Sequence, residues 1–470
     1  MDKATGSFEA LAAREGGLQH RLSSAQLTMI AIGSAIGTGL FLGSGAAIQL
    51  AGPGVIVSYV IGAAIALLLM SCLAEMVVAH PTTGSFGAYA EHYVSPLAGF
   101  LVRYAYWAAV VFVIGAEVTA VAVYMAYWFP GVPAWVWILG FSAVLVWINA
   151  SSVDVFGVAE YWCSMIKVVA IVAFLVVASY AIYRAPEGGP IGFHNYVDAG
   201  RFLPHGWHGV WFGAVVSIFS FFGIELIAVA AGEAREPEAA ATSAFRSTLF
   251  RLVFFYLCTL ALMLAIVPWQ QAGTGKSPFV RVMEILGIAG GAGVMNFVVL
   301  TAALSSMNAQ LYVSTRMLFS LARGGQAPVA LGVVSQRGVP LRALAVSSSG
   351  AALAAVLSVV LPGHSFLLMM ALAMFGALFT WLVIFITHQR FRRAAEREGR
   401  ALRFRMWGFP VLTSIGAMAM ATIIVSTAWM ADFRMTLVVG VPFLLIMAGV
   451  FAWIRTRRSS PASRRNAQTW

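Results

Sequence analysis

Residues 33–39 read GSAIGTG and lie inside the first long apolar segment of the chain, residues 25–50. Three glycines in seven residues remove side chains and weaken a helix, by about 1 kcal/mol for each glycine relative to alanine. In hydrocarbon, an unwound stretch persists only where protein or a water-filled cavity satisfies its backbone groups. The same glycines fit the GxxxG spacing of close helix packing, so this stretch alone leaves both interpretations open.

A second interruption, residues 219–225 with the sequence FSFFGIE, places a glycine beside a carboxylate in the sixth apolar segment. Interruptions in the first and sixth segments are the spacing expected for two inverted halves of five helices each. In that architecture the half-helix N-termini face an anionic group, and the freed carbonyls bind a cation. A zwitterionic amino acid carries both charges, so the two interruptions together predict an amino acid site between them.

The composition is that of a membrane protein, because 60% of the 470 residues are hydrophobic and only 10% are charged. Soluble proteins carry about 25% charged residues, so much of this chain must face lipid. The net charge of +11 does not indicate nucleic-acid binding, since the basic residues gather in short connections without a recognition motif. The first 24 residues lack the apolar core of a secretory signal, and we expect them to be cytoplasmic.

Twelve segments are long and apolar enough to cross a bilayer as helices, which takes about 20 residues each. An even number of spans with the N-terminus inside places most of the 29 Lys and Arg residues in cytoplasmic segments, as the positive-inside rule expects. The predicted spans are residues 25–50, 54–79, 97–128, 133–150, 158–183, 209–232, 245–268, 290–321, 342–361, 365–388, 409–430 and 435–454.

These spans divide the chain into six regions. We expect a cytoplasmic N-terminal segment, a first and a second inverted repeat, a basic cytoplasmic loop, a final pair of helices and a cytoplasmic tail. The arginines of the basic loop favour an anchor on anionic lipid headgroups, with a regulatory binding site as the alternative. In chain order the regions are residues 1–24, 25–183, 209–388, 389–408, 409–454 and 455–470.

Three charged residues lie far from the predicted membrane interfaces: Glu117 in the third span, Lys167 in the fifth and Glu225 in the sixth. A charge at the bilayer centre costs roughly 2.5–3.5 kcal/mol, so such residues are functional candidates, with a structural ion pair as the alternative. A low-dielectric site favours the neutral form of lysine, which predicts that Lys167 exchanges a proton. Glu117 is a candidate partner of the substrate ammonium or of Lys167, and Glu225 a candidate brace or proton relay.

Other polar residues in the spans have less specific interpretations. Ser305, Ser306 and Asn308 in the eighth span either join helices or solvate the Lys167 ammonium. Glu75, at the end of the second span, is expected to be interfacial or structural. The three cysteines lie in apolar runs, and no metal-ligand or nucleophile–base pattern occurs. We therefore predict no metal site, no cofactor and no enzymatic activity.

Five separated motifs resemble the amino acid transporter (AAT) family of bacterial permeases, within the amino acid–polyamine–organocation superfamily. The resemblance covers about residues 20–460, and the order of the motifs makes it specific. The motifs are MIAIGSAIGTGLFLGSG at 29–45, AEVTA at 116–120 with YWFP at 127–130, IKVVA at 166–170, FFGIE at 221–225 and ALSSMN at 303–308.

The resemblance implies an all-α membrane protein with twelve transmembrane helices, in which helices one to five and six to ten form the inverted repeat of a LeuT-type fold. Two peripheral helices complete it. By this likeness, backbone groups of Thr38 and Gly39 bind the substrate carboxylate, and Ile224 faces the side-chain pocket. The carbonyls that receive the substrate ammonium belong to Ala35, Phe219, Ser220 and Phe222.

Proton coupling is a further implication of the resemblance. Lys167, beside Ser305 or Ser306, takes the place of the second sodium ion of sodium-coupled relatives, and a fixed cation there favours H⁺ over Na⁺. We expect a proton/amino-acid symporter of the bacterial inner membrane, with an exchanger without net proton flux as the alternative. Ile224 stands where many relatives have an aromatic residue or another side chain, which leaves specificity open. The lack of a further buried acid favours neutral or aromatic amino acids, or 4-aminobutyrate.

Overall fold

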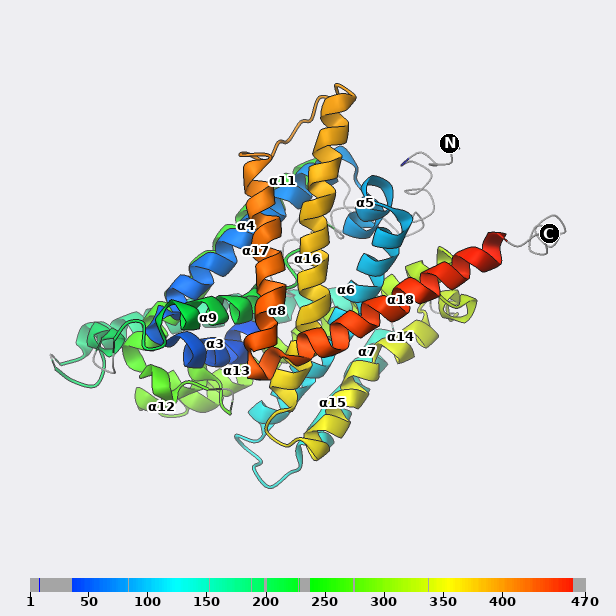
Figure 1. The fold of residues 1–470 in the computed structure, drawn as a ribbon. Coiled ribbons are helices and arrows are strands. Elements are labelled where there is room, and N and C mark those ends of the chain that lie inside the picture. Colours follow the sequence, from blue (N-terminus) through cyan, green and yellow to red (C-terminus); the bar gives the residue numbers. More distant parts are fainter. Residues whose placement is uncertain are drawn as a thin grey trace.

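The computed structural model describes most of the membrane-embedded chain. It covers residues 36–82, 84–151, 153–186, 188–197, 201–226, 237–273, 275–336 and 338–459, with Phe8 and Ala228, and gives only the backbone for 153–161, 237–249, 251 and 457–459. Within these ranges the chain is helical and contains no β-strand (Figure 1). The all-α prediction is therefore confirmed for the part of the chain that is described.

The helices follow the apolar segments of the sequence, and glycine or proline residues lie at many of their ends. Four of them, α3, α5, α12 and α14, are shorter than ten residues. The bounds are α3 Ser44–Ala51, α4 Val55–Ala79, α5 Ser85–Tyr93, α6 Pro96–Met125, α7 Ala134–Ser151, α8 Val153–Arg184, α9 Gly206–Phe221, α11 Pro237–Ile266, α12 Pro278–Ile285, α13 Gly291–Arg323, α14 Leu341–Ser347, α15 Ser349–Val360, α16 Ser365–Arg397, α17 Val411–Ser426 and α18 Met435–Ser459.

Nine helical stretches among the described residues are long and apolar enough to cross a membrane. One of them, Gly39–Ala79, joins the first two predicted spans through the turn Gly52–Gly54, and Gly206–Phe221 and Leu252–Ile266 are shorter apolar helices. The chain is therefore a multi-pass membrane protein.

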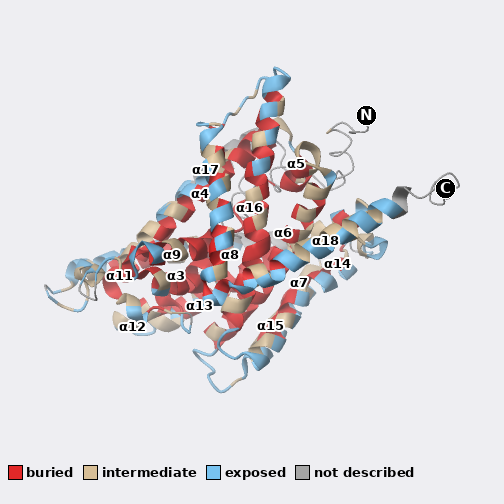
Figure 2. Cartoon of the chain, in the orientation of Figure 1, coloured by how far each residue is buried: buried red, intermediate tan, exposed pale blue. Residues whose placement is uncertain are grey.

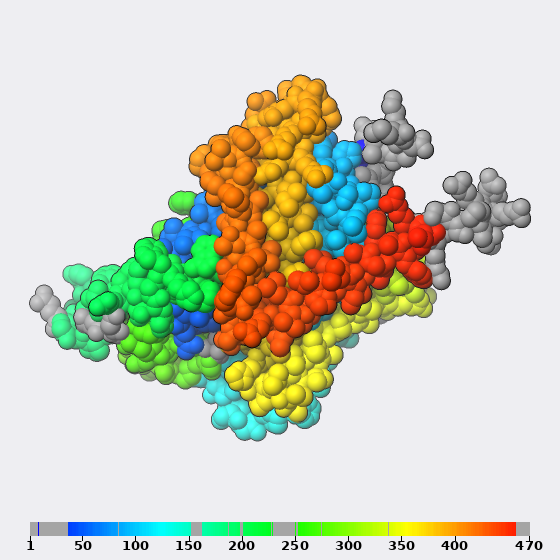
Figure 3. All heavy atoms as spheres, viewed as in Figure 1, coloured from blue at the N-terminus to red at the C-terminus, as the bar shows by residue number. Residues whose placement is uncertain are grey.

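The centre of the molecule is built on α6 and α16, which pack against each other and against α4, α5 and α13. Figure 2 shows buried residues concentrated on these helices, whereas α18 is mostly exposed. In the most apolar window of α6, 83% of the residues are buried, compared with 6% for α18. The space-filling view shows α18 lying across the surface (Figure 3). The central helices therefore form the buried interior of the protein, and α18 lies at its periphery.

Two features of the fold differ in detail from the sequence prediction. Helix α16 continues to Arg397, so the first half of the expected basic loop 389–408 is helical. The short helices α5 and α12 were not predicted, because nine and eight residues are too few to form an apolar span. Each one follows a long helix and packs back against the bundle, α5 on α6 and α12 on α13.

Candidate substrate site between two interrupted helices

The first interruption lies at the start of the described apolar stretch. Gly39–Gly43 form a single turn of π-helix, η1, directly before α3. A Cβ atom added to Gly39 would lie 2.8 Å from the Cα atom of Ser220 and 3.0 Å from the carbonyl oxygen of Phe219. Glycine permits this approach because it has no side chain. Gly39 therefore lets the two interruptions approach each other closely, and Gly33 to Ala35 of the motif lie outside the described residues.

The second interruption follows α9 immediately. Phe222 has an extended ψ of 137°, and Gly223 has a φ of 102°, a conformation that other residues rarely adopt. The backbone N–H of Gly223 points at the carboxylate of Glu225, 3.2 Å from each oxygen. The helix is thus unwound where the sequence places glycine beside the acid.

Glu225 is fully buried and fastens this unwound segment to two central helices. The Tyr106 hydroxyl of α6 donates a hydrogen bond to Glu225 Oε1 at 2.8 Å. The Trp381 indole N–H of α16 donates one to Oε2 at 3.3 Å. With the N–H of Gly223, the carboxylate accepts hydrogen bonds from three donors. These hydrogen bonds hold the carboxylate in place, and the two roles considered for Glu225, a brace or a proton relay, both remain predictions.

Two tyrosines hold the other side of the second interruption. The Tyr59 hydroxyl of α4 lies 2.8 Å from Ser220 Oγ, and the Tyr256 hydroxyl of α11 donates to the Ser220 carbonyl at 2.8 Å. Both tyrosines are fully buried, and their rings approach each other edge to face. Sequence reasoning missed them, although a buried tyrosine hydroxyl usually has a partner. Ser220 is therefore anchored to α4 and α11.

Glu117 of α6 lies at the first interruption. Its Oε1 atom accepts from Ser306 Oγ of α13 at 2.8 Å, and its two oxygens lie 3.4 and 3.3 Å from the backbone nitrogen of Thr38. A Cβ atom on Gly37 would lie 2.5 Å from Glu117 Oε1. The buried carboxylate thus occupies the backbone N–H that the family resemblance assigns to the substrate carboxylate.

Lys167 of α8 is fully buried, and its positive charge acts on the Glu117 carboxylate. Ser305 is buried next to Ser306 on α13. Asn308 instead accepts a hydrogen bond from the side-chain amide of Asn149 at 2.7 Å, which joins α13 to α7. Among these α13 residues, Ser306 therefore contacts Glu117, and Asn308 takes part in helix packing.

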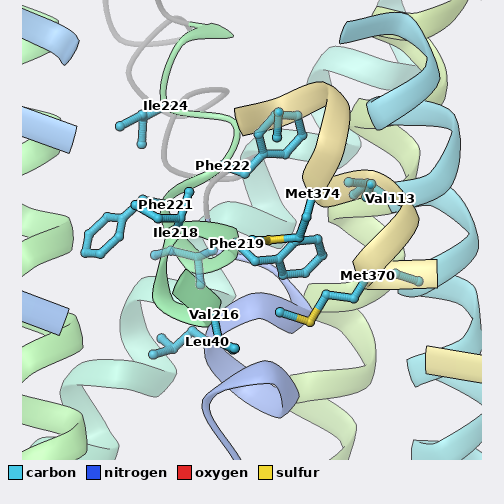
Figure 4. Close-up of a cluster of buried hydrophobic side chains, with 14 of the residues drawn as sticks. Leu40, Val113, Val216, Ile218, Phe219, Phe221, Phe222, Ile224, Met370 and Met374 are labelled. Atoms are coloured by element: carbon cyan, nitrogen blue, oxygen red, sulfur yellow. The ribbon is translucent and has the colours of Figure 1, made fainter. Parts of the chain in front are cut away.

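An apolar cluster adjoins these polar groups. Figure 4 shows Met370 and Met374 of α16 directed toward Phe219, with Val113 nearby. Ile224 lies on the opposite side of the unwound segment from Phe222 in the same view. Ala35, which was also predicted to bind the substrate, lies outside the described residues.

A separate buried network lies at the far end of α4. Glu75 forms an ion pair with Arg392 of α16, accepts from the backbone N–H of Met406 at 2.7 Å and lies 3.1 Å from His388 Nε2. His388 Nδ1 lies 3.3 Å from the hydroxyl of Thr413 on α17. Glu75 therefore joins α4, α16 and the segment before α17.

Known proteins resemble this chain over most of its length. The family pattern described as "Amino acid permease" matches residues 26–461. The gamma-aminobutyric acid permease of Bacillus subtilis is 40% identical over 89% of this chain and 90% of its own. The aromatic amino acid transport protein AroP of Escherichia coli is 38% identical over 92% of this chain and 95% of its own. An uncharacterised B. subtilis permease, YtnA, is 36% identical over 96% and 98%.

Proposed function

Because this chain belongs to the amino acid permease family and is a transporter rather than an enzyme, we propose that it imports an amino acid together with H⁺ by alternating access. The named relatives carry gamma-aminobutyric acid or aromatic amino acids, which supports an amino acid as the cargo. The membrane is the bacterial inner membrane, with both termini in the cytoplasm, and lipid surrounds the helices.

The proposed architecture has twelve spans arranged as a LeuT-type inverted repeat with two peripheral helices. The first repeat is residues 25–183, the second is 209–388, and the peripheral pair is 409–454. The segments 1–24, 389–408 and 455–470 are cytoplasmic. The order of elements supports this division, because interruptions fall in the first and sixth spans. The short helices α5 and α12 occupy the same place in each half, after the second and the seventh predicted spans.

The substrate binds between the two interruptions. Its carboxylate takes the backbone N–H groups of Thr38 and Gly39 and displaces Glu117 from that of Thr38. Its ammonium binds carbonyl oxygens and the released Glu117. The carbonyls concerned are those of Ala35, Phe219, Ser220 and Phe222, and Ser220 contributes the lone pair that Tyr256 leaves unused.

One observation carries the coupling proposal: Glu117 lies at the substrate's own N–H donor while the charge of Lys167 acts on it. Substrate binding removes the Thr38 N–H from Glu117 and brings the substrate ammonium to it. The proton affinity of the site that contains Glu117 and Lys167 therefore changes, and a proton is taken up or released. Ser305 and Ser306 solvate these groups. Glu225 holds the second interruption, with a relay of the proton as its alternative role.

The test is uptake by purified protein in vesicles with an alkaline interior, with and without Na⁺. We expect gradient-driven, sodium-independent accumulation of an amino acid, abolished by a protonophore. An exchanger gives the opposite pattern. It shows counterflow against preloaded amino acid but no response to the pH gradient, and that result would overturn proton symport.

A further inference from the structure

A cavity of about 190 Å³ lies between α6, α15, α16 and α18. None of the residues that the candidate substrate site uses lines it. Helix α6 contributes Phe112, α15 contributes Leu353, α16 contributes Leu372 and α18 contributes Phe443. These four side chains are half-buried, so the cavity opens at the surface of the molecule. We call it the α18 cavity.

Close packing at two glycines fixes the inner walls of the α18 cavity. A Cβ atom on Gly350 of α15 would collide with the carbonyl oxygen of Val111 on α6. A Cβ atom on Gly376 of α16 would collide with that of Ala105. Glycines allow helices in membranes to approach closely in this way. The three helices are therefore held at these two points, and the small side chain of Ala108, which also lines the cavity, leaves space unfilled.

Helix α18 forms the outer wall. It packs on α6 and α16, and Figure 3 shows it lying across the outside of the molecule. Near its start, the hydroxyl of Thr436 donates to the carbonyl of Ala371 on α16 at 2.8 Å. Near its end, the ring of Phe451 lies 5.2 Å from that of Phe100 on α6. These two contacts flank Phe443 along α18, so the helix is attached on both sides of the cavity.

The lining of the α18 cavity is apolar. None of the described residues that line it is charged, and Ser349 is the single hydroxyl among them. Trp107 also lines it, but its indole N–H already donates to Ser347 Oγ at 3.2 Å. A buried water needs two to four polar partners, and apolar cavities of about 150 Å³ stay dry and bind a ligand as large as benzene. The α18 cavity therefore suits a short stretch of hydrocarbon rather than water.

The surface around the opening faces lipid. Val356 of α15 is 58% exposed, and Leu445 of α18 is 69% exposed. The lining residues lie inside the apolar spans, at 105–112 within Pro96–Met125 and at 439–443 within Ala431–Thr456. At this depth a multi-pass membrane protein meets the acyl chains of the bilayer. The α18 cavity is therefore continuous with the surface that contacts lipid.

We infer that the α18 cavity binds one acyl chain of a membrane phospholipid. The chain makes the dispersion contacts that the walls of an empty cavity would lack. Its headgroup stays outside, at the membrane interface, because the lining offers no charge and one hydroxyl. The bound chain packs the peripheral helix α18 against α6, α15 and α16.

The test is photolabelling of the full chain in vesicles that contain phosphatidylethanolamine with a diazirine at the middle of one acyl chain. After illumination, mass spectrometry assigns the label residue by residue. We expect Phe112 and Phe443 to be labelled about 10-fold more than the exposed residues Val356 and Leu445, the scale of preference that one hydrophobic contact supplies. A ratio between residues of one chain does not depend on the amount of protein.

Ala108→Leu fills the α18 cavity with a larger apolar side chain. We expect it to lower the labelling of Phe112 and Phe443, relative to Leu445, about 10-fold. Ala352→Leu is the matched control, because Ala352 is exposed on α15 and does not line the cavity. Its labelling ratio should stay at the wild-type value. If Ala108→Leu does not fold, Leu353→Trp fills the cavity from α15, with the same expected loss.

Two results would overturn the bound acyl chain. The first is equal labelling of the lining and of the exposed residues in the wild type, or labelling of the lining that persists when the cavity is filled. The second is a disulfide-linked dimer of Phe443→Cys, absent from the wild type, in the same vesicles, since a second copy of the protein would then cover the cavity. Either result leaves the proposed proton symport untouched, because the α18 cavity shares no residue with the substrate site.

Discussion

The two interrupted helices use a carboxylate in different ways. At the second interruption the acid is local: Glu225 accepts from Gly223, two residues away, and is fixed by Tyr106 and Trp381 at 2.8 and 3.3 Å. At the first interruption the acid comes from another helix, because Glu117 of α6 reaches the N–H of Thr38 at 3.3–3.4 Å.

The difference separates a permanent hydrogen-bonding partner from one that can be exchanged. A carboxylate with three donors from its own segment and two central helices stabilises the unwound backbone whether or not substrate is present. Glu117 keeps a 2.8 Å hydrogen bond to Ser306, but its contacts with the Thr38 N–H are long, at 3.3–3.4 Å, so another carboxylate can replace it at that N–H. We therefore propose a structural role for Glu225, with the proton relay as its alternative, and a transport role for Glu117.

The largest effect is expected for Lys167→Met. The variant removes a fully buried positive charge that acts on Glu117, and with it the group that we propose exchanges the proton. We expect gradient-driven accumulation to be abolished while counterflow persists. Lys276→Met is the control, because Lys276 forms an exposed ion pair with Glu284. Full gradient-driven uptake by Lys167→Met would show that this lysine has only a structural role.

A smaller effect is expected for Gly37→Ala. The new methyl group would lie 2.5 Å from Glu117 Oε1 and 2.8 Å from Ser306 Oγ, so the carboxylate must move. Misplacing a functional group by about 1 Å costs up to ~100-fold in rate, and we expect the maximal uptake rate to fall 10-fold or more on this scale. Gly131→Ala, which meets no atom within 4 Å, should transport normally. An unaltered rate in Gly37→Ala would argue against a critical position for Glu117.

A moderate effect is expected for Tyr256→Phe, which removes the hydroxyl that binds the Ser220 carbonyl. One hydrogen bond contributes about 1 kcal/mol, so we expect KM to rise about 5-fold with little change in kcat. Tyr196→Phe removes a similar bond to the Ala261 carbonyl, on the same helix α11 but away from the interruptions. Equal changes in both variants would indicate a general loss of stability instead of positioning at the site.

The features that could be predicted from the sequence are those marked by a glycine or a charged residue inside an apolar segment. Both interruptions, and the burial of Glu117, Lys167 and Glu225, follow from glycines and charges inside apolar segments. The contacts of Tyr59 and Tyr256 could not be predicted, because a tyrosine in a span is compatible with both a membrane interface and a buried hydrogen bond. Their partner, Ser220, lies on a different helix.

Other parts of the molecule depend on tertiary packing alone. Glu75 was expected to be interfacial or structural, and the sequence did not indicate its partners. Arg392 and His388 of α16, which contact it in the interior, are more than 300 residues away along the chain. Methionines such as Met370 are frequent in apolar spans, so only the structure distinguishes those beside the interruptions. Periodicity and composition therefore identify helices and charges, but not which side chains meet across them.

The smallest effect is expected for His80, which lies outside the spans at the end of α4. Burial, followed by the charges of Arg400 and His92, lowers the pKa of His80 to about 4. The imidazole is therefore neutral throughout pH 5.5–8 and gains a proton only near pH 4. We expect His80→Gln to leave the pH profile of uptake unchanged in this range. A shifted profile would assign part of the pH dependence to this end of the molecule.

The most direct test of the different roles of the two carboxylates is to compare Glu117→Gln with Glu225→Gln in the same vesicles. Substrate-induced proton flux and counterflow are measured for each variant. We predict that Glu117→Gln loses the proton flux while counterflow continues, and that Glu225→Gln keeps the wild-type ratio of protons to substrate with weaker binding. Proton flux that survives in Glu117→Gln and disappears in Glu225→Gln would contradict this assignment.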